Sequence, residues 1–382
     1  MIYLDYAATT PVDPRVAKQM AACLTLDGAF GNPASTTHEF GWQAAKLVET
    51  ARQQIASLLN ADPREIIFTS GATEADNLAI KGIANFYKDR GNHIITMRTE
   101  HKAVLDTCAF LEENGFKVTY LSPQADGRLD LAELTAAISK QTILISIMHV
   151  NNETGIIQDL TAISQIAKQH NIFFHTDAAQ SIGKLIIDTQ TLPVDLISIS
   201  GHKIYAPKGI GALYVRRKPK VRLQALLHGG GHEQTLRSGT LPTHQIVGLG
   251  SALALAQENR FIEQEKLKTL RQYLMRELAT IPQSEFNGNQ EYCVPNILSV
   301  RFAGIDAEAL MASCPELAFS AGSACTSAAI VPSHVLQAMG IVNETANSTI
   351  RLSIGRFTTL AELETAVKII RKQVARLRDL LP

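Results

Sequence analysis

A lysine stands within a stretch whose other residues favour a rigid loop between two buried strands. Lys203 lies in SISGHKIYAPKGIGALYV, which covers residues 198–215. The apolar runs at 195–200 and 210–215 predict strands, and Pro207 with several glycines shapes the loop between them. Most lysines are solvated and need no such setting. Lys203 is therefore a candidate chemical group, because a held lysine amine can form an imine with a carbonyl compound.

Other polar side chains follow further apolar runs. They are His101, Asn152, Asp177, Gln180, Ser200 and His202. An aspartate directly after an apolar run is costly to bury without a partner, although an N-cap or a surface ion pair would also explain it. A lone histidine is likewise more often structural than catalytic. Each residue alone is weak evidence, so their meaning depends on whether the fold brings them together.

The residues SGAT at 70–73 also follow an apolar run, and they open a helical pattern. Small residues at a helix start expose backbone N–H groups, and the helix dipole adds positive potential there. This arrangement suits a phosphate at Ala72 and Thr73. The competing interpretation is an ordinary N-cap, which is the commoner use of Ser or Thr before a helix.

The elements that must position these residues alternate as strand and helix. The apolar runs are short, β-branched and without polar alternation, which is typical of parallel strands buried on both faces. In such sheets ligands bind beyond the carboxyl ends of the strands, so we expect the polar residues to surround one site. The predicted strands are 65–69, 93–97, 117–121, 142–150, 172–176, 195–200 and 210–215, with helices at 72–88 and 102–113.

The last third of the chain has a different pattern, with helices around one strand. These segments are helices at 243–279, 306–313 and 360–380, and a strand at 293–302. We predict an α/β protein with a large domain of residues 13–255, built on a mostly parallel seven-stranded sheet. Residues 1–12 and 256–382 form a smaller α+β domain in this prediction.

Composition limits the class of protein. The 382 residues carry 36 Lys+Arg and 36 Asp+Glu, which argues against broad nucleic-acid binding and a membrane-surface role. No signal peptide is visible at MIYLDYAATTP, and no apolar stretch is long enough to span a bilayer. Five cysteines without CxxC spacing fit free thiols in a reducing cytoplasm rather than disulfides or zinc. We therefore expect a cytoplasmic protein.

The strand-end residues together suggest a cofactor. A lysine beside a phosphate site, with an aspartate from a neighbouring strand, is the arrangement that pyridoxal phosphate requires. Lys203 would form a Schiff base with the aldehyde, and Asp177 would pair with the pyridine nitrogen. His101 would lie against the ring face.

Ten separated motifs, in order, resemble one family over nearly the full length of the chain. The chain resembles the cysteine desulfurases of the NifS/IscS-like group, which are fold-type I pyridoxal phosphate enzymes within the class-V aminotransferase family. The motifs are YLDYAATTPVDPRV, FGNPAS, FTSGATEADNLAIKG, TEHKAVLDTC, SIMHVNNETG, DAAQSIGK, SGHKIYAPKGIGALYVRRKP, HGGGHEQTLRSGT, SAGSACTSA and IRLSIGRFTT.

The resemblance implies roles for individual residues. Lys203 would hold the cofactor, Thr240 would reach the phosphate of the other subunit, and Arg351 with Asn152 would bind the substrate carboxylate. Arginine suits that task because its planar fork binds a carboxylate at two points. The implied cofactor contacts are Ala72, Thr73, His101, Asn152, Asp177, Gln180, Ser200, His202, Lys203 and Thr240.

The resemblance also singles out Cys325, in the small-residue sequence SAGSACTSA. A lone intracellular cysteine is usually buried and inert, and this interpretation stands for the other four cysteines. The family pattern reverses it for Cys325, on a loop at about 320–332 of the small domain. Cys325 would take sulfur from L-cysteine as a persulfide and leave L-alanine, with His101 assisting proton transfer. Transient ligation of an iron–sulfur cluster by Cys325 is a further expectation.

The implied partners are a second copy of the chain and proteins that accept sulfur. Acceptors would serve iron–sulfur cluster assembly and tRNA thiolation, without direct nucleic-acid binding or membrane contact. Family members usually carry a tail for docking an iron–sulfur scaffold beyond the point that corresponds to Pro382, where this sequence ends. Two alternatives stay open: this sequence is truncated, or the protein meets its partners differently. The alternatives are a selenocysteine lyase, another fold-type I enzyme such as an aminotransferase, and a non-catalytic interaction protein. The last predicts loss of Lys203, Asp177 or Cys325, and all three are present.

Overall fold

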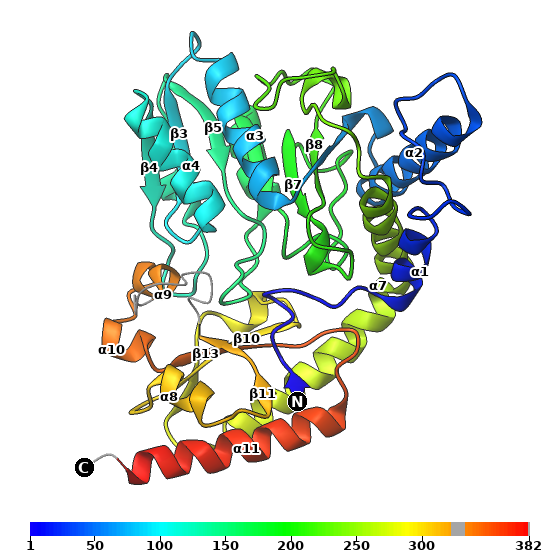
Figure 1. Ribbon diagram of the computed structural model, residues 1–382. Helices are drawn as coiled ribbons and strands as arrows, with labels where there is room; N and C mark the ends of the chain where they lie inside the picture. Colours follow the sequence, from blue (N-terminus) through cyan, green and yellow to red (C-terminus); the bar gives the residue numbers. More distant parts are fainter. Residues whose placement is uncertain (322–332, 381–382) are drawn as a thin grey trace.

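The computed structural model describes residues 1–321 and 333–380, and its largest element is a seven-stranded sheet (Figure 1). The strand order is β2-β8-β7-β6-β5-β3-β4, and every pairing is parallel except the two made by β8. The predicted α/β class with a mostly parallel seven-stranded sheet is confirmed. The strands are β2 (Ile66–Thr69), β3 (His93–Met97), β4 (Lys117–Leu121), β5 (Thr142–Ser146), β6 (Phe173–Asp177), β7 (Leu196–Ser200) and β8 (Gly211–Val215).

The described residues also form α-helices before, between and after the strands of the large sheet. They are α1 (Pro14–Ala21), α2 (Glu39–Leu59), α3 (Ala72–Phe86), α4 (Lys102–Glu113), α5 (Leu131–Ala137), α6 (Leu160–Gln169), α7 (Thr243–Leu278), α8 (Ala307–Ala312), α9 (His334–Ala338), α10 (Asn343–Ala346) and α11 (Leu360–Asp379). The sequence analysis did not predict α1 and α2, although α2 begins at a His38 N-cap and ends at Asn60 in a left-handed conformation.

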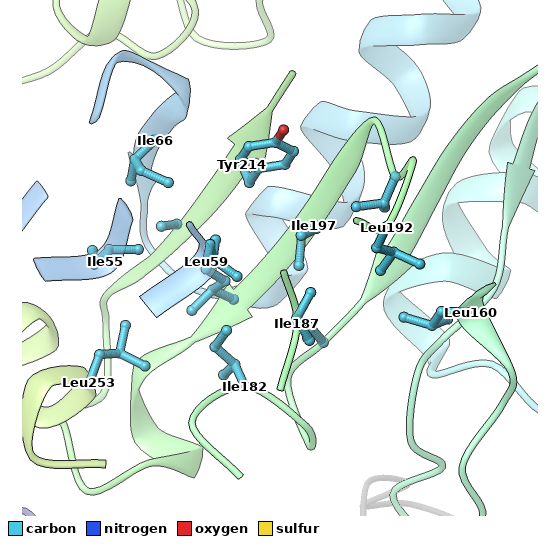
Figure 2. Close-up of a cluster of buried hydrophobic side chains, with 14 of the residues drawn as sticks. Ile55, Leu59, Ile66, Leu160, Ile182, Ile187, Leu192, Ile197, Tyr214 and Leu253 are labelled. Atoms are coloured by element: carbon cyan, nitrogen blue, oxygen red, sulfur yellow. The ribbon is translucent and has the colours of Figure 1, made fainter. Parts of the chain in front are cut away.

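Both faces of the large sheet are buried, because successive strand residues point to opposite faces and both sets are apolar. Ile94 and Leu144 pack in a core with α3 and α4, whereas Ile95 and Ile145 pack in a second core with α2, α6 and α7. In Figure 2, Leu59 of α2 lies beside the sheet in this second core. Burying each such side chain stabilises the fold by about 1.5–3 kcal/mol. Because the strands carry apolar side chains on both faces of the sheet, burial is favourable on both faces.

A second, smaller group of strands lies below the large sheet in Figure 1. An antiparallel sheet has the order β12-β13-β10-β9, and β1 pairs in parallel with β11. The sequence predicted only the strand corresponding to β10, because the others are short or interrupted by charged residues. The bounds are β1 (Ile2–Tyr3), β9 (Ser284–Phe286), β10 (Ile297–Phe302), β11 (Leu317–Ala318), β12 (Ser320–Ala321) and β13 (Thr349–Ser353).

Helix α7 belongs to both parts of the molecule. Leu249 and Leu253 pack in the core of the large sheet, whereas Leu270 and Leu274 pack against the small antiparallel sheet. A continuous helix therefore crosses the point between residues 255 and 256 where the sequence analysis divided the chain. The division into two domains stays a prediction.

The predicted strand at 142–150 is too long. β5 ends at Ser146, and the amide of Met148 donates to Glu100 Oε1 at 2.9 Å. The amide of His149 donates to the Asp177 carbonyl. Backbone hydrogen bonds to β6 thus continue past Ser146, at Ile147 and His149, although the regular strand ends at Ser146. Among the described residues, no helix is both long and apolar enough to cross a bilayer.

Candidate active site

A cavity of about 410 Å³ lies at the carboxyl ends of the parallel strands. Ligands of doubly wound sheets bind at this edge, which is where the sequence analysis expected the site. The cavity is lined by Ala7, Ala8, Ser70, Gly71, Ala72, Thr73, Glu74, His101, Met148, Val150, Asn152, Asp177, Ala179, Gln180, Ser200, His202, Lys203, Lys208, Gly209 and Arg351. Of the predicted site residues within the described part of the chain, it therefore brings together all but Thr240.

Lys203 ends the short 3₁₀ helix η2 (Gly201–Lys203), which directly follows β7. Its side chain is half-buried, and its Nζ donates to the carbonyl oxygens of Ala7 and Ala8 at 2.5 and 2.6 Å. These two residues come from the N-terminal segment, which crosses the cavity floor. The amine is thus directed into the cavity by contacts from a distant part of the chain.

The residues after Lys203 are held rigidly. Tyr205 has a left-handed backbone (φ 66°), which is unfavourable for a bulky residue and requires compensation. Its amide donates to Thr10 Oγ1 at 2.7 Å, and its hydroxyl accepts from the Arg356 amide at 2.6 Å. The Arg356 guanidinium also lies 4.2 Å from the centre of the Tyr205 ring. These contacts fix the loop that carries Lys203.

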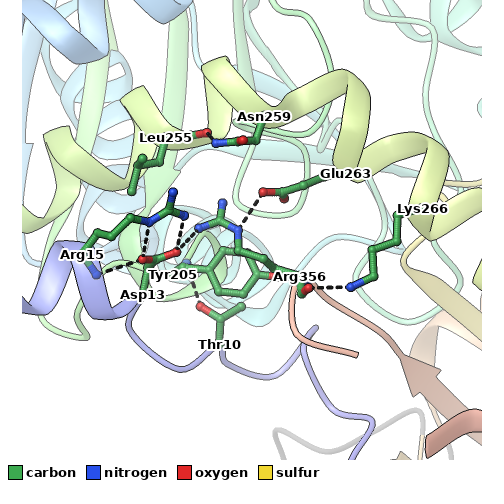
Figure 3. A network of polar contacts seen from close by, with 9 residues as sticks. All are labelled: Thr10, Asp13, Arg15, Tyr205, Leu255, Asn259, Glu263, Lys266 and Arg356. Carbon is green, nitrogen blue, oxygen red and sulfur yellow. Dashed lines mark hydrogen bonds and ion pairs between the residues drawn. The ribbon is translucent and has the colours of Figure 1, made fainter. Parts of the chain in front are cut away.

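Figure 3 shows that Arg356 is in turn held between two carboxylates. Its Nη1 lies 2.6 Å from Asp13 Oδ2, and its Nε lies 2.7 Å from Glu263 Oε1 on α7. Hydrogen bonds from Arg15, followed by those from Arg356, hold the pKa of Asp13 well below its usual range. The network therefore ties the N-terminal segment, the lysine loop and α7 together.

Asp177 is the last residue of β6, and its side chain is buried at the cavity wall. Burial raises its pKa, while the Ala179 amide, which donates to Oδ1 at 2.8 Å, and the charges of His101 and Lys203 oppose that rise. A cationic ring nitrogen in the cavity would supply the missing counter-charge. The position suits the role that the resemblance implies.

The start of α3, where the sequence predicts an anion cradle, has no side-chain cap. Its N-cap is Gly71, which has φ 155° and no side chain to cap the first-turn N–H groups. The backbone packs closely here, since a Cβ on Gly211 would lie 2.7 Å from Gly71 Cα. The ordinary N-cap interpretation is therefore wrong, because Ser70 and Thr73 do not cap this helix. Ser200 and His202 line the same cavity, and burial lowers the pKa of His202 to about 4.

Gln180 and His101 present different groups to the cavity. Gln180 Nε2 donates to the Ala7 carbonyl at 2.9 Å, while its buried Oε1 has no hydrogen-bond partner among the described residues. A ligand hydroxyl would satisfy that oxygen. His101 caps α4 by accepting the Ala103 amide at Nδ1 (3.1 Å), so a neutral ring carries its proton on Nε2. His101 can therefore donate a proton or hydrogen bond from Nε2.

Arg351 lies in the middle of β13 and is only 3% exposed, so it is not a surface residue at a strand edge. Its Nη1 donates to the Asn152 carbonyl at 2.8 Å, and its Nη2 donates to Asp5 Oδ1 at 2.9 Å. Its buried Nε has no partner among the described residues. The guanidinium therefore keeps a donor for an incoming carboxylate.

Thr240 does not line the cavity of this chain. Thr240 is exposed and comes after η3 (Glu233–Thr235). Cys325, including its predicted role as a cluster ligand, lies outside the described residues. The other four cysteines are largely buried, and burial raises the pKa of each, to about 12 for Cys108 and about 11 for Cys293 and Cys314.

The sequence analysis missed the contributions of Ala7, Ala8 and Asp5. The two alanines act through backbone carbonyls, which leave no side-chain signal. Asp5 reaches Arg351 across 346 residues of sequence. The only available signal was that these residues lie in the first of the ten family motifs.

Comparison with known proteins defines the class. The profile of the family described as Aminotransferase class-V matches residues 2–365. The chain belongs to this family, and its fold is that of fold-type I pyridoxal phosphate enzymes.

Individual relatives are more specific. The chain is 60% identical to Cysteine desulfurase IscS of Pectobacterium atrosepticum, and 58% identical to that of Escherichia coli O139:H28; each match covers 100% of this chain and 94% of the relative. A solved structure described as a NifS-like protein superposes with a TM-score of 0.91 at 36% identity, covering 98% of this chain and 99% of the other. SspA in complex with cysteine superposes with a TM-score of 0.81 at 40% identity, covering 94% and 100%.

Proposed function

We propose that this protein is a cysteine desulfurase, an enzyme that removes sulfur from L-cysteine and leaves L-alanine. The observation that carries the proposal is one cavity lined by a lysine amine, a buried carboxylate and the uncapped start of α3. The full-length similarity to cysteine desulfurases supports it independently. The alternatives, a selenocysteine lyase or another fold-type I enzyme, are not favoured because these relatives are all cysteine desulfurases.

Pyridoxal phosphate fits the residues present. The orphaned Oε1 of Gln180 would accept from the ring hydroxyl, Asp177 would hold the ring nitrogen, and Lys203 would hold the aldehyde carbon. The phosphate would bind at the start of α3, beside Thr73, Ser200 and His202. When bound, the cofactor draws electrons from the substrate Cα and so weakens bonds around it.

The remaining groups would orient the substrate and move protons. Arg351 would bind the carboxylate of L-cysteine, because its guanidinium belongs to a residue that lines the cavity and keeps an unpaired Nε among the described residues. Lys203 Nζ, once displaced by the substrate amine, would take the Cα proton. His101 would donate from Nε2. Burial of the site keeps these transfers away from bulk water.

Cys325 would accept the sulfur as its thiolate. The substrate Cβ–S bond breaks, a bond forms between that sulfur and Cys325 Sγ, and the substrate carbon skeleton gains the protons that make L-alanine. L-cysteine and one enzyme thiol thus give L-alanine and one enzyme persulfide, so atoms and electrons balance without a further oxidant. An acceptor thiol then removes the outer sulfur.

The first prediction tests this function. With pyridoxal phosphate, L-cysteine and dithiothreitol, the protein is expected to produce alanine and sulfide in equal amounts. Cys325→Ser should lose sulfide release yet keep the change in cofactor absorbance on addition of L-cysteine, because binding does not need the thiol. Cys108→Ser is the matched control, and its buried thiol should be dispensable. Full turnover by Cys325→Ser would falsify the assignment.

A homodimer is part of the proposal. Thr240 is exposed and lies outside its own cavity, as a residue that serves a second subunit would. The exposed aromatic side chains of Phe30, Phe40 and Trp42 lie close together in sequence, and the Phe30 and Phe40 rings are 5.2 Å apart. An apolar surface of this kind supports burial against a partner. We also propose a cytoplasmic location and transfer of the sulfur to acceptors for iron–sulfur assembly or tRNA thiolation.

A further inference from the structure

A row of buried polar side chains lies beside Asp177. His175 precedes it by two residues on β6, so both side chains point to the same face of the sheet. The His175 ring is fully buried, with Nδ1 2.9 Å from Ser146 Oγ on β5 and Nε2 2.9 Å from Ser198 Oγ on β7. Ser198 is the residue of β7 that pairs with Asp177. The row is therefore built into the strands that carry the site.

A second carboxyl group, that of Asp76, meets this row from α3. It is fully buried, and its Oδ1 lies 3.6 Å from His175 Nε2. Neither Asp76 oxygen has a well-formed hydrogen bond within the described chain, although the Ser198 hydroxyl is close enough to favour the charged form. A buried carboxylate with so little support is very costly, whereas a protonated carboxyl is not.

The groups that face Asp76 add to this cost. Burial is the main cause that raises its pKa well above the usual range, and the charges of Asp177 on β6 and Glu100 after β3 raise it further. His175 offers no positive charge, because burial lowers its pKa to about 3. The strands β5 and β7 contribute only the hydroxyls of Ser146 and Ser198 to the row.

Asp177, unlike Asp76, has a backbone hydrogen-bond donor and positive charges close to its carboxylate. It accepts the Ala179 amide, and Lys203 and His101 place positive charge near it. Of the three buried acids, Asp76, Glu100 and Asp177, only Asp177 lines the cavity. A single negative charge shared among them is therefore most stable on Asp177.

We propose that Asp76 is a positioning residue for Asp177, an uncharged acid that orders His175 and leaves the negative charge of the cluster facing the cavity. Protonated Asp76 donates toward the Ser198 hydroxyl, which donates to His175 Nε2, and the ring then donates from Nδ1 to Ser146 Oγ. This inference rests on the proposed function, because a charged Asp177 matters there through the cofactor ring nitrogen. Asp76 itself touches neither cofactor nor substrate.

The first test concerns the charge of Asp76 and does not depend on activity. An acid whose pKa is raised by folding stabilises the fold at low pH, and this contribution falls as pH rises between the unfolded and folded pKa values. Asp76→Asn removes that dependence. The melting temperature of D76N relative to the wild type should therefore rise as the pH increases above the unfolded pKa of the carboxyl, and level off where Asp76 ionises in the folded protein, for the full-length chain with and without pyridoxal phosphate. The exposed Asp106→Asn is the control and should show no such trend.

The second test concerns positioning. Cofactor affinity and the pH midpoint of the cofactor absorption band are measured for D76N and for Asp76→Leu, which has similar size but cannot donate. D76N should bind pyridoxal phosphate within twofold of the wild type, with an unchanged midpoint. D76L should bind roughly tenfold more weakly, with a shifted midpoint, because the row of Ser198, His175 and Ser146 loses the donor at its end.

Each other outcome overturns the proposal. A flat stability difference for D76N would mean that Asp76 is charged in the folded protein. Equal shifts of the pH midpoint in D76N and D76L would mean that the negative charge of Asp76 is what matters. An unchanged midpoint in D76L would mean that Asp76 does not position Asp177. If the wild type itself binds no pyridoxal phosphate, the proposed function fails, while the stability comparison still decides the charge of Asp76.

Discussion

At the residue scale, the site depends on where charges are held rather than on how many there are. Arg351 is buried but tied to Asp5 and to the Asn152 carbonyl, so its guanidinium is fixed before any substrate binds. Lys203 is likewise fixed by two backbone carbonyls. Preorganised groups of this kind bind a ligand without a further ordering cost.

The second prediction concerns Arg351→Lys. Lysine keeps the charge but loses the planar fork, so KM for L-cysteine should rise roughly 10- to 100-fold, the range expected for losing one hydrogen bond to a charged group. Steady-state kinetics with sulfide detection measures the effect. Arg301→Lys on the neighbouring strand β10 is the control, since that side chain pairs with Glu285 and does not line the cavity. An unchanged KM for R351K would remove Arg351 from the substrate site.

The third prediction concerns Glu153, which is buried and accepts the Ser333 hydroxyl. Burial raises its pKa from 4.5 to about 7. Because the folded pKa is the higher one, the wild type loses stability as pH rises from about 4.5 to about 7. Glu153→Gln should therefore become more stable than the wild type over that range, by at most about 3 kcal/mol, and the difference should level off above it.

Urea unfolding at several pH values tests this prediction. The exposed Glu113→Gln serves as the control, because a solvated carboxyl has no burial cost to relieve. A stability difference for E153Q that is independent of pH would contradict the argument.

At the element scale, a buried ion pair anchors the segment that leads to Thr240. Residues Glu233, Gln234 and Thr235 all have left-handed backbones, with φ of 48°, 57° and 68°. Consecutive residues in this conformation are unfavourable unless tertiary contacts impose it. Glu233 supplies such contacts, because its carboxylate accepts from both Nη groups of Arg52 and from the Phe68 amide on β2.

The fourth prediction follows from that anchor. Glu233→Gln should lower the free energy of unfolding by roughly 3 kcal/mol, because it leaves the buried Arg52 guanidinium without its counter-charge. The same guanidinium also contacts Glu49, which is 56% exposed, so Glu49→Gln is a matched control with an expected effect below about 1 kcal/mol. Equal effects of the two substitutions in urea unfolding would show that burial of the pair is unimportant.

At the scale of the whole molecule, the cavity needs parts from the entire chain. The N-terminal segment contributes Ala7 and Ala8, the large sheet contributes Asp177, the turn after β7 contributes Lys203, and the small sheet contributes Arg351. Helix α7 packs in the cores of both sheets and so links them. The site therefore forms only when the complete fold has formed.

The fifth prediction concerns the proposed dimer. Trp42→Glu combined with Phe40→Glu places charge on the exposed aromatic surface, and the protein should become monomeric in light scattering after gel filtration. Cofactor affinity should fall with it, because Thr240 could no longer reach a partner's phosphate site. Phe261→Glu is the control, since Phe261 is 69% exposed on α7, away from this surface in sequence. A wild-type protein that is already monomeric would contradict the proposal.

The sequence by itself determined the sheet and the residues at its edge. Parallel strands buried on both faces require unbroken apolar runs, and their carboxyl ends must meet at one edge. Asp177, Gln180 and Lys203 could therefore be placed around one site from their positions alone. The predicted end of the strand at 142–150 was wrong, because buried residues outside a regular strand have the same apolar composition as those within it.

Only the tertiary structure decided which groups support that edge. The carbonyls of Ala7 and Ala8 reach Lys203 across about two hundred residues, and backbone groups have no side-chain identity to read. Asp76 looks like any polar residue of a helix, yet folding removes it from water and places it beside His175. The physical reason is that the charge of a buried group depends on its neighbours in space, which local sequence does not specify.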